Sequence, residues 1–144
     1  MAGDLFTFDH VTVRFDDAVV LDDVSASLPA GQLVVIAGAS GSGKSTMLRC
    51  CNRLEAPASG VVRLEGTDVC SLDVRDVRRR VGMVFQQPTP FPGTALDNLR
   101  VGRPDLSEPD AAALLDSVGL DRSFLDRDAT TLSGGEAQRL CVAR

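Results

Sequence analysis

A long apolar segment and an excess of positive charge are both missing from this sequence. Its longest apolar run, residues 33–39, is far shorter than the roughly 20 residues that cross a bilayer. The N-terminal residues Met-Ala-Gly-Asp-Leu provide neither the basic start nor the apolar core of a secretory signal. The net charge is −5, so the basic surface typical of nucleic-acid binders is not expected. We therefore expect neither a membrane-spanning nor a secreted protein, and no nucleic-acid partner.

Cysteine, histidine and lysine are scarce as well. The four cysteines, none of which forms a Cys-x-x-Cys pair, are Cys50, Cys51, Cys70 and Cys141. They are expected as small apolar core residues in a reducing, cytoplasmic compartment. The single histidine, His10, has no set of metal ligands around it, and Lys44 is the only lysine among 15 basic residues. The 144 residues, 44% hydrophobic and 24% charged, suit one globular domain with a buried core.

The beginning of the chain is patterned for strands. Residues 5–15 and 18–28 alternate apolar and polar side chains, as half-buried strands do. Residues 32–37 form a continuous apolar run, which is typical of a strand buried on both faces of a parallel sheet. The glycine-rich stretch 38–43 follows, and residues 44–53 carry an apolar helical stripe. That stripe consists of Met47, Leu48, Cys51 and Leu54.

Shorter elements follow up to residue 93. We expect a strand over 61–64, a helix over 73–80 and a second buried strand over 81–85. The loop 86–93 contains three prolines and therefore cannot be regular structure. The arginines of the predicted helix, expected on a solvated face, are Arg75, Arg78, Arg79 and Arg80.

Helices are expected from residue 94 onward. The residues 107–110, Ser-Glu-Pro-Asp, predict a helix start, and Gly119 ends that helix. Residues 111–116 are apolar and end in an aspartate, but their Ala/Leu composition favours an amphipathic helix over a buried strand. A last helix is expected from Ser133 to Arg144.

The glycine-rich stretch carries the chemistry. Residues 38–45, Gly-Ala-Ser-Gly-Ser-Gly-Lys-Ser, fit the pattern G-x-x-x-x-G-K-[ST] without a mismatch, between a predicted strand and a predicted helix. Backbone N–H groups of such a loop converge on an anion, and the helix N-terminus adds partial positive charge. Lys44 would reach the β- and γ-phosphates and Ser45 would ligate Mg²⁺. A plain glycine-rich turn is the alternative. The expected nucleotide-binding residues are Gly38, Ala39, Ser40, Gly41, Ser42, Gly43, Lys44, Ser45 and Thr46.

A second glycine-bearing string, Leu-Ser-Gly-Gly-Glu-Ala-Gln-Arg, covers residues 132–139 at the start of the last helix. Two glycines in a helix interior cost about 1 kcal/mol each relative to alanine. In return they expose backbone N–H groups beside the Ser133 hydroxyl, which makes a second anion site at a helix start. An ordinary serine N-cap would explain Ser133 but not the full string.

In this order, the two motifs resemble those of the ATP-binding cassette (ABC) ATPases, the nucleotide-binding subunits of ABC transporters. Residues 38–45 look like the family's Walker A motif and residues 132–136 like its signature motif. Gln86 is similar to the family's Q-loop glutamine, which helps position Mg²⁺ and the attacking water and relays the nucleotide state to the membrane subunit. Phe15 lies where the family places an aromatic ring on adenine, although a core position is equally open for a phenylalanine.

The resemblance implies an α/β fold: a P-loop NTPase (RecA-like) core with an N-terminal antiparallel β subdomain and a helical subdomain, the C-terminal part of the core being missing. Within a single incomplete domain 1–144 it implies a β subdomain with P-loop core (1–86), a helical subdomain (87–133) and the start of the signature helix (134–144). The cofactors would be ATP and Mg²⁺, the latter held by Ser45 and Gln86.

The resemblance also implies partners. ATP on Gly41, Gly43, Lys44 and Ser45 of one copy would be closed over by Ser133, Gly134, Gly135 and Glu136 of a second copy or a paralogue, in a head-to-tail dimer. A transmembrane permease would hold the protein on the inner face of the cell membrane. The transported solute and the direction stay open, although residues 51–54 and 88–92 resemble phosphate-importer and metal-exporter ATPases.

Two family features do not occur in the sequence. No Walker B strand with its catalytic glutamate follows the signature, and no switch histidine comes later, since His10 precedes the P-loop. We therefore expect an ATP hydrolase by resemblance that is inactive as these 144 residues alone. A non-hydrolysing nucleotide-binding module and a soluble ABC ATPase acting on DNA or ribosomes are the alternatives, and the acidic charge disfavours the latter.

Overall fold

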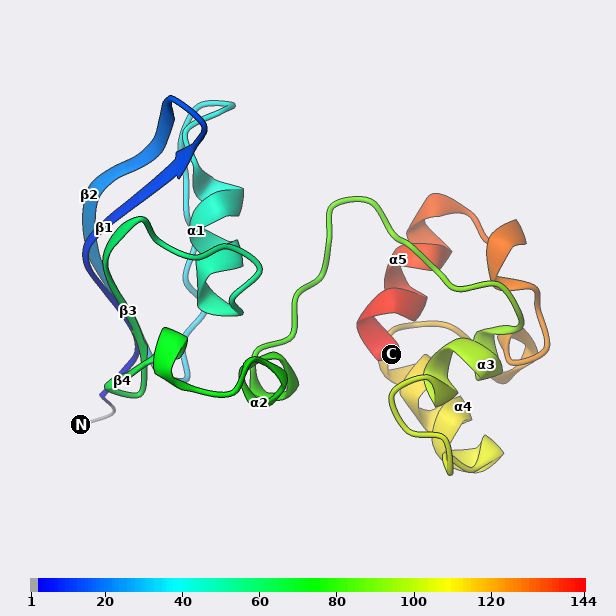
Figure 1. The fold of residues 1–144 in the computed structure, drawn as a ribbon. Coiled ribbons are helices and arrows are strands. Elements are labelled where there is room, and N and C mark those ends of the chain that lie inside the picture. The colour runs from blue at the N-terminus through cyan, green and yellow to red at the C-terminus, as the bar shows by residue number, and fades with distance from the viewer. Residues whose placement is uncertain (1–2) are drawn as a thin grey trace. The chain divides into compact units, whose positions relative to one another are not determined.

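The structure, a computed structural model, describes residues 3–144, so Met1 and Ala2 of the expected domain lie outside the described residues. It consists of two compact units, Met1–Met83 and Val84–Arg144 (Figure 1). The subdomain boundary predicted from the sequence lies after Gln86, three residues later than this division. The prediction also separated 87–133 from 134–144. Among residues 3–144, none of the helices combines the length and apolar character needed to traverse a bilayer.

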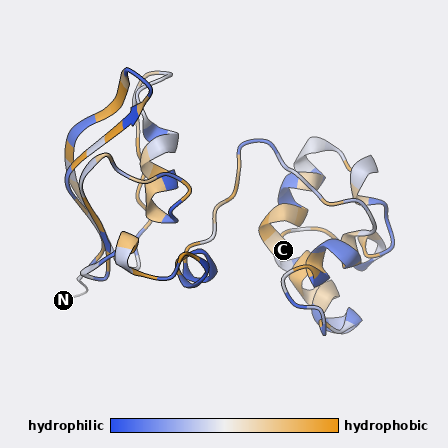
Figure 2. Ribbon diagram, viewed as in Figure 1, coloured by the Kyte–Doolittle hydropathy of each residue, from blue (hydrophilic) through white to orange (hydrophobic). Residues whose placement is uncertain are grey.

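The first unit is built on an antiparallel sheet of four strands in the order β2-β1-β3-β4. The strands are β1 (Asp4–Phe15), β2 (Ala18–Pro29), β3 (Ser59–Leu64) and β4 (Thr67–Asp68). Hydrophobic and hydrophilic residues follow one another along β1 and β2, which form a hairpin (Figure 2). The strands predicted over 5–15, 18–28 and 61–64 are confirmed, because alternation is a local signal that needs no knowledge of the partner strand.

Strand β1 keeps its buried face through a bulge. The register with β2 shifts between Phe8 and Val11, and His10 has a φ of +50° there. The extra residue changes the parity of the alternation, so Phe6, Phe8, Val11 and Val13 all point into the core. The His10 ring bonds Asp23 of β2 across the bulge at 2.7 Å, and this hydrogen bond raises the pKa of His10 above 6.5.

Helix α1 (Lys44–Cys51) adds its buried face to the same core. The stripe predicted from the sequence is partly wrong: Met47 and Cys51 are buried, whereas Leu48 and Leu54 are 48% and 38% exposed. The helix also ends before the predicted Arg53, whose φ of +56° is incompatible with a continuing helix.

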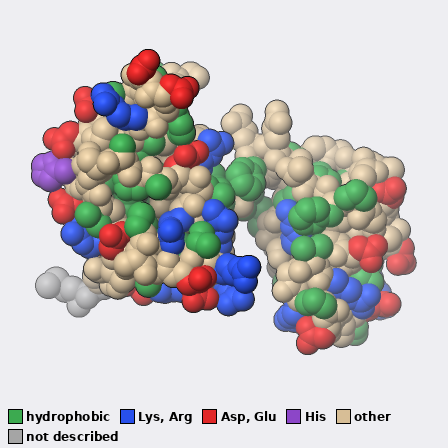
Figure 3. Space-filling model, viewed as in Figure 1, with side chains coloured by type: hydrophobic (Ala, Val, Ile, Leu, Met, Phe, Trp, Pro, Cys, Tyr) green, Lys and Arg blue, Asp and Glu red, His purple; other side chains and the backbone are tan. Residues whose placement is uncertain are grey.

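A side chain of helix α2 (Val74–Arg80) covers the end of α1. Arg78 donates to the backbone carbonyls of Asn52 and Arg53, at 3.3 and 2.8 Å. These carbonyls follow the last turn of α1, so no N–H group of a further helical turn is present to bond them. The expectation that the four arginines lie on a solvated face is confirmed, since all four are exposed, and Arg78 reaches the end of α1 from that surface. Basic side chains do gather at the surface over α2, where Arg79 and Arg80 are exposed (Figure 3).

The two buried strands predicted over 32–37 and 81–85 are not formed. Both segments lack a hydrogen-bonded strand partner among residues 3–144. Leu33 and Val35 are 94% and 79% exposed, and Val84 and Phe85 are also exposed. An apolar β-branched run favours extended backbone, but a strand exists only where a neighbour completes its hydrogen bonds. The parallel sheet of the expected core is accordingly absent from the described residues, and the observed sheet is antiparallel.

The second unit is helical around its own core. Its elements are α3 (Ala95–Arg100), α4 (Glu108–Ser117), η2 (Arg122–Phe124), η3 (Ala129–Thr131) and α5 (Gly134–Ala143). Ser107 caps α4 with Pro109 in its first turn, and Gly119 follows the helix with a φ of +72°. The prediction that residues 111–116 form a helix is confirmed, and the last helix begins as expected after Ser133.

The cysteines only partly follow the sequence-based expectation. Cys50 and Cys51 are buried in the first core, and burial raises the pKa of their thiols to about 11 and about 12. Cys70 is exposed and Cys141 half-buried, so neither is the core residue expected from composition. Cys70 lies in η1 (Val69–Ser71), a short surface helix whose backbone is capped by Asp68.

Candidate functional site

The loop 38–43 enters helix α1 through two glycines in the left-handed region. Gly41 and Gly43 both have φ of +81°, which glycine adopts without strain. Gly43 is also the N-cap of α1 and lies against β2. A Cβ there would lie 2.6 Å from Leu21 Cδ2 and 2.7 Å from the Val20 carbonyl oxygen. The pattern of glycines thus follows from the path that the backbone must take into the helix.

The start of α1 differs from the starts of the other α-helices that the structure describes. Of the five α-helices within residues 3–144, α1 alone has an N-cap residue that makes no side-chain hydrogen bond. The others are capped by Asp73, Thr94, Ser107 and Ser133. The first turn of α1 also contains no acidic residue. No capping side chain and no acidic residue therefore offsets the partial positive charge at this helix start, which favours an anion.

The Lys44 ammonium lies across this loop. Its Nζ donates to the carbonyls of Gly38 and Ala39 at 3.0 and 2.7 Å, and lies 3.4 Å from Ser42 Oγ. The positive charge is therefore held at the loop, beside the uncapped helix start. Residues lining a surface pocket here are Val20, Gly41, Ser42, Gly43, Lys44, Ser45 and Thr46. Ser45 is exposed, whereas the Thr46 side chain is buried under the pocket; Ala39 and Ser40 are exposed in the loop.

Phe15 ends strand β1 and is 41% exposed. It pairs with Ala18 at the turn of the hairpin and is outside the core of the first unit. The alternative that Phe15 is a core residue is therefore wrong. The ring is accessible to a flat ligand, and stacking on adenine stays a prediction.

The signature string forms a capping box at the start of α5. Ser133 Oγ accepts from the Glu136 N–H at 3.4 Å, and the Glu136 carboxylate accepts from the Ser133 N–H at 2.8 Å. These hydrogen bonds to Ser133 hold the pKa of Glu136 below its ordinary value, so the carboxylate is charged at neutral pH. Ser133, Gly134 and Gly135 are exposed. The S-x-x-E spacing was the signal in the sequence that could have predicted this box.

Gln86 is exposed at the beginning of the second unit, and Phe85, the residue before it, is hydrogen-bonded to a side chain of α5. Gln138 Nε2 donates to the Phe85 carbonyl oxygen at 2.9 Å. The structure thus brings the backbone next to Gln86 together with the helix that begins at the signature string. Sequence analysis missed Gln138, because a single glutamine on a helix carries no pattern that predicts a contact with a loop.

The proline-rich loop after Gln86 is held by another residue that sequence analysis missed. Asn98 of α3 is fully buried, and its carboxamide accepts from the Phe91 N–H at 2.7 Å and donates to the Phe91 carbonyl at 2.9 Å. Arg144 places its guanidinium 4.5 Å from the centre of the Phe91 ring and donates to the Thr89 carbonyl. The Phe91 ring itself remains about half exposed. The loop is thus ordered although it contains no regular structure.

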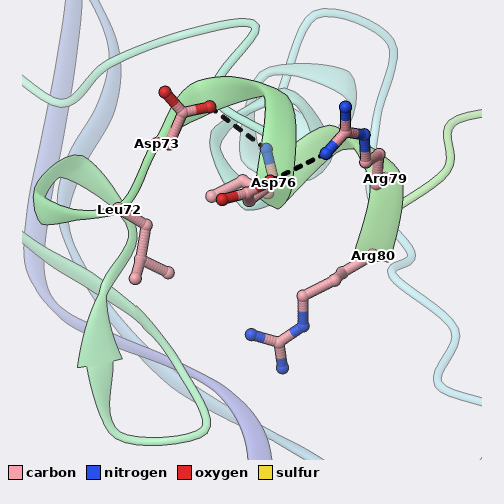
Figure 4. Close-up of a pocket in the computed structure, with 6 residues that line it drawn as sticks. Leu72, Asp73, Asp76, Arg79 and Arg80 are labelled. Carbon is pink, nitrogen blue, oxygen red and sulfur yellow. Dashed lines mark hydrogen bonds and ion pairs between the residues drawn. The ribbon is translucent and has the colours of Figure 1, made fainter.

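A further pocket, beside α2, has different chemistry (Figure 4). Its charged side chains bond protein groups: Asp73 caps α2, Asp76 pairs with Arg79 at 3.1 Å, and Arg80 pairs with Glu65. No trio of metal-ligating side chains gathers anywhere within residues 3–144. The uncapped, lysine-bearing start of α1 is therefore the better anion site.

A glycine loop at an uncapped helix start, and a second exposed glycine-bearing helix start, define a nucleotide-binding domain of the P-loop class. Comparison with known proteins gives the family. The chain belongs to the ABC transporter family, whose sequence pattern it matches over residues 21–144.

Two relatives and one solved structure illustrate the match. The chain is 43% identical over 140 residues to ABC transporter I family member 17 of Arabidopsis thaliana, covering 94% of this chain and 53% of the relative. It is 37% identical over 158 residues to the phosphate import ATP-binding protein PstB 1 of Vibrio cholerae, covering 96% and 57%. The chain therefore spans about half the length of these relatives.

The solved structure is cbiO1 from Clostridium perfringens, described as part of the ABC transporter complex cbiONQ. It matches with a TM-score of 0.83 at 21% identity, covering 98% of this chain and 60% of that one. At this identity the likeness concerns the fold. It extends over both units of the chain.

Proposed function

We propose that the chain is the ATP-binding part of an ABC transporter subunit, which holds Mg-ATP at the loop 38–45. The observation that carries the proposal is the uncapped start of α1 with the Lys44 ammonium beside it. A helix N-terminus without a capping side chain favours an anion, and a triphosphate carries several negatively charged oxygens. On binding, the phosphate oxygens would replace the carbonyls of Gly38 and Ala39 as partners of Lys44.

The first unit offers an oxygen donor that suits Mg²⁺. The Ser45 hydroxyl is exposed at the first turn of α1, within the loop and helix start that are proposed to hold the phosphates. Hydroxyl and carbonyl oxygens are ligands that Mg²⁺ accepts, with nucleotide phosphates and water completing its shell. Bound Mg²⁺ would neutralise charge on the phosphates, while Lys44 and the α1 N–H groups orient them. Phe15 is proposed to stack on the adenine.

The second anion site belongs to a neighbouring copy in this proposal. The exposed N–H groups of Gly134 and Gly135 and the Ser133 hydroxyl would close over the γ-phosphate bound by another copy or a paralogue. The charged Glu136 carboxylate holds the Ser133 backbone, so we assign it to shaping this helix start rather than to contacting phosphate. Closure that depends on the γ-phosphate lets nucleotide turnover drive a conformational cycle.

The membrane partner follows from the family. A permease subunit is proposed to dock on the ordered loop after Gln86, which would place the protein at the inner face of the cell membrane. Relatives differ in what they carry, so the proposal names no solute. From the 144 residues alone we expect nucleotide binding without ATPase turnover above background; turnover that Lys44→Ala abolishes would refute this expectation.

Sedimentation velocity with Mg²⁺ and a non-hydrolysable ATP analogue tests the two-copy site. A Cβ at Gly134 meets no atom within 4 Å, so both Gly134→Ala and Gly134→Asp fit the structure. An aspartate in the first turn is compatible with the helix but repels phosphate. We expect the wild-type chain and Gly134→Ala to dimerise with the analogue and not with ADP, and Gly134→Asp to bind it as a monomer. A Gly134→Asp variant that dimerises like the wild type would refute the head-to-tail arrangement.

A further inference from the structure

We draw no further inference here: the strongest candidate, the apolar segment 32–37 with its exposed Leu33 and Val35 and the apolar pocket that it lines together with β2 and α1, carries nothing, because nothing in the structure shows what covers it.

Discussion

Replacing Asn98 by alanine should release the proline-rich loop from the second unit. The carboxamide of this fully buried residue makes hydrogen bonds of 2.7 and 2.9 Å to the two backbone groups of Phe91. It also donates to the Thr94 carbonyl at 2.9 Å, but that carbonyl keeps the helical bond from the Asn98 N–H. Arg144 Nη1 also donates to the carboxamide oxygen, at the longer distance of 3.5 Å, so the loss falls mainly on the Phe91 backbone.

The magnitude follows from these two bonds. Each is worth about 1–1.5 kcal/mol net, and alanine regains about 0.5 kcal/mol from its higher helix propensity. We therefore expect Asn98→Ala to lower the free energy of unfolding of the second unit by about 2 kcal/mol. Asn52→Ala is the control in the first unit, because Asn52 is similarly buried but accepts only one long bond, from the Leu54 N–H at 3.3 Å.

Urea unfolding followed by far-UV circular dichroism measures the loss, since the chain contains no tryptophan or tyrosine to report by fluorescence. Hydrogen exchange of the peptide covering residues 88–93 locates it, and the Phe91 amide should lose protection. A loss below about 0.5 kcal/mol, or a protected Phe91 amide in the variant, would show that Asn98 does not hold the loop.

Three other predictions address the first unit. Gly43→Ala should lower the free energy of unfolding by about 2–3 kcal/mol, from backbone strain and the contacts with β2, and a change below about 1 kcal/mol in urea unfolding would contradict the close approach. The hydrogen bond to Asp23 raises the pKa of His10 above 6.5, so its contribution to stability is present below pH 6.5 and is lost as pH rises through the folded-state value. An NMR titration should find this pKa returning toward 6.5 in Asp23→Asn, and an unmoved midpoint would count against the pair. Exposed Cys70 should react with a thiol reagent in the folded protein, and Cys51, whose pKa is about 12, only after unfolding; equal rates would contradict the burial.

The sequence predicted local features of the fold well and non-local ones poorly. Alternation in residues 5–15 and the Ser-Glu-Pro-Asp start of α4 are each readable from neighbouring residues, and both elements formed. The predictions of strands over 32–37 and 81–85 were wrong, because a strand forms only with a partner strand and the local pattern does not contain that partner. The bulge at His10 was missed for a related reason, since it appears only when β1 is set in register with β2.

The candidate site divides in the same way. The loop 38–45 is a continuous motif, so its residues and their expected roles follow from the local sequence alone. The supporting contacts do not: Gln138 meets Phe85 across 53 residues, and Arg144 meets Thr89 across 55. Nothing in the spacing of these residues marks them, because their partners are backbone carbonyls that any sequence would supply.

The central claim is that the uncapped start of α1 and Lys44 bind the phosphate chain of the nucleotide. Isothermal titration of ATP, ADP and AMP into the wild-type chain and Lys44→Met tests it most directly. We predict that affinity falls with each phosphate removed, and that Lys44→Met weakens ATP binding by roughly 10- to 150-fold, the loss of charge-assisted hydrogen bonds worth about 1.5–3 kcal/mol, while AMP binding hardly changes. AMP binding as tightly as ATP, or ATP binding unaffected by Lys44→Met, would contradict the claim.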